Sequence, residues 1–122
     1  MDTESLPFSP ARAVGDWVFL SGQGGFVPES GELAGDSIEE QTEQTIRNIA
    51  ALLRQHDCTL ADVVSCLVHL SDLGHFRRFN EIYAQHFPEP RPVRTTVGAR
   101  LVGGMLVEIT VVAHAHTSVG AR

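Results

Sequence analysis

The stretch from residue 105 to residue 114 alternates between two kinds of side chain with a period of two. One set is apolar throughout and consists of Met105, Val107, Ile109, Val111 and Ala113. The other set is mixed and consists of Leu106, Glu108, Thr110, Val112 and His114. Successive side chains of a β-strand point to opposite faces of its sheet, so this pattern predicts a strand with one face against a core. The chain therefore needs other elements to cover that face.

Two segments predict helices that could provide the cover. Ser37 followed by Glu40 is a capping box, which marks a helix start, and apolar or small residues then recur at helical spacing until about His56. A second helix is predicted to run to about His86, because aromatic residues recur at steps of three and four at Phe76, Phe79, Tyr83 and Phe87. Regular structure should then stop at the prolines Pro88, Pro90 and Pro92.

Shorter apolar runs predict the other strands. A hairpin turning at Gly15-Asp16 accounts for the first two, and a turn at Gly103-Gly104 precedes the last. The four additional predicted strands are Arg12–Val14, Trp17–Ser21, Val63–Leu70 and Arg94–Leu101. The resulting order, ββαβαββ, predicts an α+β fold with a single sheet and two helices on one face. A sheet covered on only one side leaves its second face exposed, and this favours self-association.

Length and composition predict one domain in the cytoplasm. The chain has 122 residues, of which 43% are hydrophobic, and this suits a single domain of roughly 100–150 residues. We expect one domain over residues 1–122, with loose tails at 1–6 and 117–122. No segment resembles a signal peptide or a membrane span. Cys58 and Cys66 form no CxxC pattern and no disulfide framework, which is typical of a reducing compartment.

The charged residues exclude several classes of function. The net charge is −6, and all nine basic residues are arginine. A chain without lysine cannot form a Schiff base with pyridoxal phosphate or carry a P-loop lysine. An acidic chain is also a poor nucleic-acid binder. His114 and His116 have the spacing of two ligands on one strand face, but a zinc site would need a third. We therefore expect no cofactor, no metal and no nucleic-acid or membrane partner.

Glu108 and Arg94 are the residues that most clearly interrupt the apolar patterns. A partly buried Glu108 would need partners and would have a raised pKa, which suits general acid/base chemistry near neutral pH. Arg94 opens a strand after the proline-rich loop, on the same side as Thr96, and its planar fork suits a carboxylate. Taken alone, each residue is also typical of an exposed strand face or strand end.

Six stretches, in this order and spacing, resemble the RidA (YjgF) family over about residues 7 to 115. They are Pro7–Ala11, Gly15–Gln23, Pro28–Leu33, Glu39–Ile49, Arg91–Val97 and Val107–Ile109. In addition, Phe76 with Asn80 and Tyr83 fits the second helix of the family. The resemblance implies a chorismate-mutase-like fold that assembles as a homotrimer with clefts between subunits. It also implies hydrolysis of a small-molecule substrate, a 2-imino acid or an enamine such as 2-aminoacrylate, to a 2-keto acid and ammonia. The family needs no cofactor or metal.

The resemblance also implies roles for six residues. Arg94 matches the arginine that binds the substrate carboxylate, and Glu108 matches the acid that positions water or shuttles a proton. Gly22 lies where the family places backbone groups near the imine. The substrate-binding residues implied in this way are Phe8, Gly22, Asn80 and Thr96. Many members have tyrosine at the position of Phe8, and a common subgroup has cysteine at that of Thr96.

Other functions on the same scaffold are possible from the sequence. A protein that binds small carboxylates or keto acids without turnover would also use Arg94. Ribonuclease or translation-inhibitor activity has been attributed to some relatives, and the net charge of −6 argues against it here. A chaperone-like role through exposed apolar surface is a further alternative.

Overall fold

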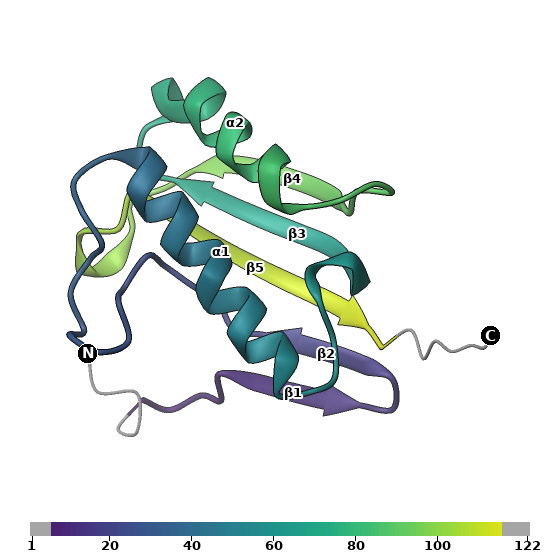
Figure 1. Cartoon of the computed structure of the whole chain (residues 1–122). Coiled ribbons are helices and arrows are strands. Elements are labelled where there is room, and N and C mark those ends of the chain that lie inside the picture. The colour runs from purple at the N-terminus through teal and green to yellow at the C-terminus, as the bar shows by residue number, and fades with distance from the viewer. Residues whose placement is uncertain (1–5, 116–122) are drawn as a thin grey trace.

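The order of strands and helices matches the sequence prediction in a computed structural model that describes residues 6–115. In chain order the elements are β1 (Ala11–Val14), β2 (Trp17–Leu20), α1 (Ile38–Arg54), β3 (Val63–Leu70), α2 (Phe76–His86), β4 (Val93–Gly98) and β5 (Val107–His114). The strands form one sheet in the order β1-β2-β5-β3-β4. Strands β3 and β4 run parallel, and the other neighbours are antiparallel. Both helices lie on one face of the sheet (Figure 1), as predicted.

Three predicted strands are shorter than expected, and one of them, β2, ends at Leu20 rather than at Ser21. The strand predicted to reach Leu101 ends at Gly98, because its only partner in the sheet, β3, ends opposite it at Leu70. The strand predicted from Met105 begins at Val107. The backbone N–H of Leu106 donates to the Gln41 side chain at 2.8 Å and so does not join a strand ladder.

The predicted turn at Gly103-Gly104 is present but does not form a hairpin. Both glycines have positive φ values, 68° and 75°, inside a 3₁₀ turn over Val102–Gly104. Strands β4 and β5, which this turn helps to connect, are separated in the sheet by β3.

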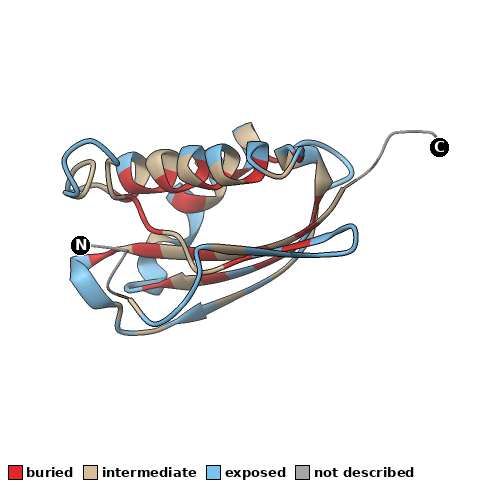
Figure 2. Ribbon diagram, turned by 90° about the horizontal axis from the view of Figure 1, so that it is seen from below, coloured by how far each residue is buried: buried red, intermediate tan, exposed pale blue. Residues whose placement is uncertain are grey.

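The hydrophobic core lies between the helices and the sheet. Figure 2 shows buried residues along the helix faces that point to the sheet. The alternation from residue 105 to 114 is confirmed, since Val107, Ile109, Val111 and Ala113 are fully buried. Cys58 and Cys66 are buried and unbridged. None of the helices in the described range could cross a membrane. The tails expected at 1–6 and 117–122 lie outside that range, except for Leu6, and so does His116.

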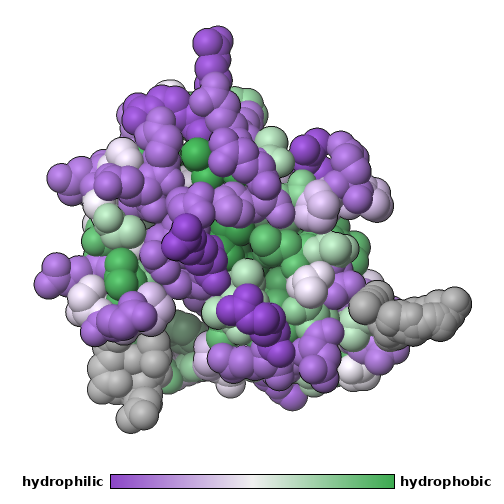
Figure 3. Space-filling model, in the orientation of Figure 1, coloured by the Kyte–Doolittle hydropathy of each residue, from purple (hydrophilic) through white to green (hydrophobic). Residues whose placement is uncertain are grey.

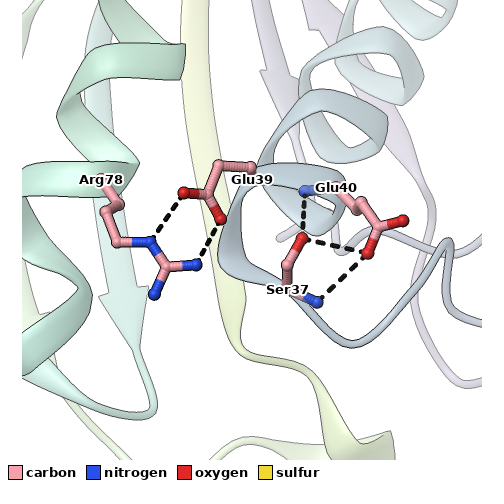
Figure 4. A network of polar contacts seen from close by, with 4 residues as sticks. All are labelled: Ser37, Glu39, Glu40 and Arg78. Atoms are coloured by element: carbon pink, nitrogen blue, oxygen red, sulfur yellow. Dashed lines mark hydrogen bonds and ion pairs between the residues drawn. The ribbon is translucent and has the colours of Figure 1, made fainter.

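The capping box predicted for α1 is present, and a salt bridge beside it joins the two helices (Figure 4). The Ser37 hydroxyl accepts from the Glu40 N–H at 3.0 Å. Arg78 on α2 donates two hydrogen bonds of 2.6 Å to the Glu39 carboxylate on α1, and these bonds lower the pKa of Glu39. This ion pair links the first turn of α1 to the start of α2, the helix that covers β4.

The two sides of the molecule differ in polarity. Hydrophilic residues cover most of the helix side (Figure 3). On the other face of the sheet, which we call the open face, several large apolar side chains are exposed to solvent in the single chain. They are Val14, Trp17, Phe19, Leu67, Val93 and Val97. Large apolar side chains exposed in this number on one face are typical of a surface that another molecule covers.

Candidate active site

Arg94 lies on the helix side of edge strand β4, beneath α2. Its register partner on β3 is the buried Cys66, and residues opposite one another share a face. Its guanidinium donates from Nη2 to Asn80 Oδ1 at 2.8 Å. The guanidinium carbon also lies 4.8 Å from the ring centroid of Tyr83, 5.3 Å from that of Phe79 and 5.6 Å from that of Phe76. We call these five residues the arginine clamp.

The charge of Arg94 is not balanced by an acid within the clamp. Asn80 is neutral, and burial raises the pKa of the Tyr83 phenol, so that this group also stays neutral. Within residues 6–115 no carboxylate forms an ion pair with Arg94. A half-buried cation held by a neutral acceptor and aromatic rings can still receive an anion, and arginine binds a carboxylate through two parallel hydrogen bonds.

Thr96 lies two residues beyond Arg94 on the same face of β4. Its register partner is Val68, a fully buried core residue, and Thr96 itself is partly buried. The structure therefore places three of the predicted site residues on one edge of the molecule, namely Arg94, Asn80 and Thr96.

Glu108 lies on the opposite, open face of the sheet. Its side chain is 28% exposed, and it is the register partner of His69 on β3. A methyl group added at Gly22 would lie 2.6 Å from Glu108 Oε2, so the glycine backbone packs directly against the carboxylate. Two backbone hydrogen bonds of 2.9 and 3.0 Å between Gln23 and Ile109 hold the Gly22 loop against β5.

A pocket of about 720 Å3 opens beside this carboxylate. Glu108, Gly22 and Phe8 all line it, so three predicted site residues meet there. Phe8 is 57% exposed and thus available to a ligand. The remaining wall is largely apolar and includes Phe26, Leu52 and Met105. We call Glu108, Gly22, Phe8 and His69 the glutamate cluster.

Another depression, of about 420 Å3, contains none of the predicted site residues. It is lined by Asp62, Arg91, Val93 and His114, among others. The glutamate cluster is the better candidate site because its pocket brings an acid, a close backbone approach and an apolar wall together. Within residues 6–115 no group of three or more His, Cys, Asp or Glu could hold a metal ion.

The two halves of the predicted site do not meet within one chain. Arg94 and Glu108 lie on opposite faces of the sheet, and β3 separates their strands. Sequence reasoning also missed two features. They are the place of His69 opposite Glu108 and the packing of the α2 aromatic rings around Arg94. Neither could be found without knowing which strands and helices are neighbours.

Comparison with known proteins adds a family to this geometry. A family model described as endoribonuclease L-PSP matches residues 3–115. A human 2-iminobutanoate/2-iminopropanoate deaminase is 35% identical over 108 residues, covering 88% of this chain and 79% of the human protein. The structure of RidA from Psychrobacter sp. PAMC 21119 is 37% identical with a TM-score of 0.87, covering 90% of this chain and 89% of that one.

A further solved structure carries a ligand. It is E. coli TdcF with bound serine, which is 27% identical to this chain with a TM-score of 0.83. The similarity covers 88% of this chain and 87% of that one.

Proposed function

Because this chain belongs to the RidA (YjgF) family, we propose that it hydrolyses 2-imino acids, or enamines such as 2-aminoacrylate, to 2-keto acids and ammonia. Relatives that are named deaminases support an imine deaminase function. The observation that carries the proposal is the arginine clamp, because its cation has no ion-pair partner within residues 6–115 and so suits the carboxylate of such a substrate. The serine bound by E. coli TdcF is likewise a small molecule with a carboxylate.

We further propose that the working site lies between copies of the chain in a homotrimer. A small substrate cannot reach Arg94 and Glu108 of the same chain at once, because they lie on opposite faces of the sheet. The open face also exposes large apolar residues that a neighbouring copy would cover. In this arrangement Arg94 of one copy and Glu108 of the next line a common cleft. We place the protein in the reducing cytoplasm, which suits its two unbridged cysteines.

The proposed reaction needs one positioned water and one carboxylate. The substrate carboxylate binds Arg94, which orients the C=N carbon toward a water beside Glu108. As the water oxygen bonds to that carbon, Glu108 accepts a water proton and passes it to the imine nitrogen, which has received the electron pair of the C=N bond. The product is a neutral carbinolamine. Backbone groups near Gly22 lie next to the same carboxylate and help to hold the water.

The second half of the reaction releases ammonia. Glu108 takes the proton of the carbinolamine hydroxyl and delivers it to the amine nitrogen. The C–N bond then breaks as the C=O bond forms, and the keto acid and ammonia leave. General acid/base catalysis is typically worth about 10²–10⁴-fold, which is enough for imines that already hydrolyse slowly in water.

Ribonuclease activity, which the description of the family model names, fits this chain less well. Nucleic-acid binding draws most of its affinity from contacts between basic side chains and phosphates. The net charge here is −6 and there is no lysine. A pure binding protein on this scaffold would keep the arginine clamp but would show no turnover at all.

The test is release of ammonia or keto acid from 2-iminobutanoate generated in situ, with uncatalysed decay subtracted. We expect clear acceleration by the wild type and almost none by Arg94→Ala or Glu108→Gln alone. The two variants should complement each other when they are co-expressed. Each mixed trimer would contain one intact cleft, and random assembly predicts about a quarter of the wild-type activity. If the co-expressed variants were no more active than either variant alone, the proposed cleft between copies would be wrong.

A further inference from the structure

Among the residues that the structure describes, His69 is the ionisable side chain in direct register with the proposed catalytic acid. It lies opposite Glu108 in the β3–β5 ladder, and its Nδ1 is 3.8 Å from Glu108 Oε1. The side chain is 26% exposed, yet Nδ1 itself is buried and makes no hydrogen bond with any residue of the described range. On its other side, β4 presents Val97, which offers the ring no polar group.

A buried ring nitrogen without a partner is unfavourable, because it has lost its hydrogen bonds to water. The Glu108 carboxylate is the acceptor best placed to satisfy it. A small rotation of either side chain would shorten the 3.8 Å separation to the usual hydrogen-bond distance of about 2.9 Å. Neutral imidazole carries its proton on one nitrogen, and the hydrogen bonds around the ring select which one.

The two oxygens of Glu108 face different neighbours. Oε1 is the oxygen near His69, whereas Oε2 lies close to Gly22, which lines the pocket together with Glu108. A donor on Oε1 would leave Oε2 free to accept a proton from water. In this arrangement Oε1 would hold the carboxylate in place and Oε2 would take part in proton transfer.

We infer that His69 is a positioning residue for Glu108, donating a hydrogen bond from Nδ1–H to Oε1 so that Oε2 faces the pocket. This inference rests on the proposed function for its catalytic consequence. His69 does not touch the substrate in this arrangement and acts only through the carboxylate. A purely structural histidine packed in the strand would instead contribute to stability and leave the chemical step unchanged.

Two substitutions separate these roles in the whole assembled protein. His69→Phe keeps a flat ring in the strand and removes the donor, so we expect kcat to fall about tenfold with KM changed less than twofold, because the carboxylate is misplaced while Arg94 still binds substrate. His69→Asn puts an amide nitrogen close to the position of Nδ1 and should recover most of the lost kcat. Unchanged kcat in His69→Phe, or an equal loss in both variants at wild-type thermal stability, would overturn the inference.

Nitrogen NMR of the histidine ring gives a readout independent of turnover. We expect the Nδ1–H tautomer of His69 in the wild type and the Nε2–H tautomer in Glu108→Leu, with the signal assigned by its loss in His69→Asn. The same tautomer in both proteins would overturn the inference. If the wild type hydrolyses no imine while the tautomer changes as expected, the proposed function fails and the His69–Glu108 hydrogen bond stands.

Discussion

The arginine clamp and the glutamate cluster are built in different ways. Asn80 and the three rings that hold Arg94 all come from a single helix, α2, packed over the edge strand that carries the arginine. The neighbours of Glu108 come from three separate segments, which are the start of the chain, the loop after β2 and strand β3. The clamp is thus fixed by regular structure, whereas the cluster depends on segments that are far apart in sequence. We expect changes in the clamp to alter affinity and changes in the cluster to alter turnover.

The largest effect should follow from Glu108→Gln. The amide keeps the shape of the side chain but cannot accept the water proton, so kcat should fall about 10³-fold while KM changes less than threefold. Steady-state kinetics with a 2-imino acid measures both values. If the protein only binds keto acids, the wild type itself should show no measurable kcat. Its affinity for a keto acid, measured by calorimetry, should then equal that of Glu108→Gln.

Removal of the cation from the clamp should come next in size. Arg94→Ala should raise KM about 100-fold, because the charge-assisted pair with the substrate carboxylate is lost. Arg94→Lys should recover only part of this, since an ammonium group cannot form the two-pronged contact. Equal KM values for Lys and Arg at this position would show that charge alone suffices and that the aromatic rings do not orient the group.

A change of one atom in the clamp offers a sharper comparison. Asn80→Asp places a carboxylate 2.8 Å from the guanidinium, where it would compete with the substrate for Arg94. We expect KM to rise about tenfold without loss of thermal stability, because the new ion pair is favourable in the free protein. A structural role for Asn80 would predict the reverse, with unchanged KM and altered stability.

Gly22→Ala tests the cluster by steric means. The added methyl group would meet the carboxylate end of Glu108 at 2.6 Å, and this flexible end can move aside. The fold should tolerate the change, but the displaced Oε2 should lower kcat about fivefold with little change in KM. Wild-type kcat in this variant would mean that the exact place of Oε2 does not limit the reaction.

The smallest expected effect concerns a contact outside both the arginine clamp and the glutamate cluster. His86 on α2 is hydrogen-bonded to Glu43 on α1 at 2.7 Å, and this bond lowers the pKa of Glu43. Stability from a carboxyl with a lowered pKa is present above its unfolded-state pKa and is lost as pH falls through its folded-state pKa. Glu43→Gln should therefore cost about 0.5 kcal/mol near pH 7 and progressively less in acid, as measured by urea unfolding. Its kcat and KM should stay at wild-type values.

The sequence predicted much of the fold because its strongest signals are local. The alternation around Glu108 and the Ser37–Glu40 box each lie within a few residues, and both are present in the structure. The early end of β4 at Gly98 depends instead on where its partner strand stops. The pairing of His69 with Glu108 depends on β5 lying between β2 and β3. Such nonlocal pairings leave no periodic trace along the chain.

The unbalanced charge of Arg94 has a practical consequence for any assay. A half-buried guanidinium with no acidic partner in the described part of the chain will bind small anions that the solution supplies. Acetate, citrate or phosphate buffers should therefore act as competitive inhibitors, and an apparent KM would contain the affinity of the buffer ion as well as that of the substrate. Kinetics measured in a buffer of bulky zwitterions would report the affinity of the clamp itself.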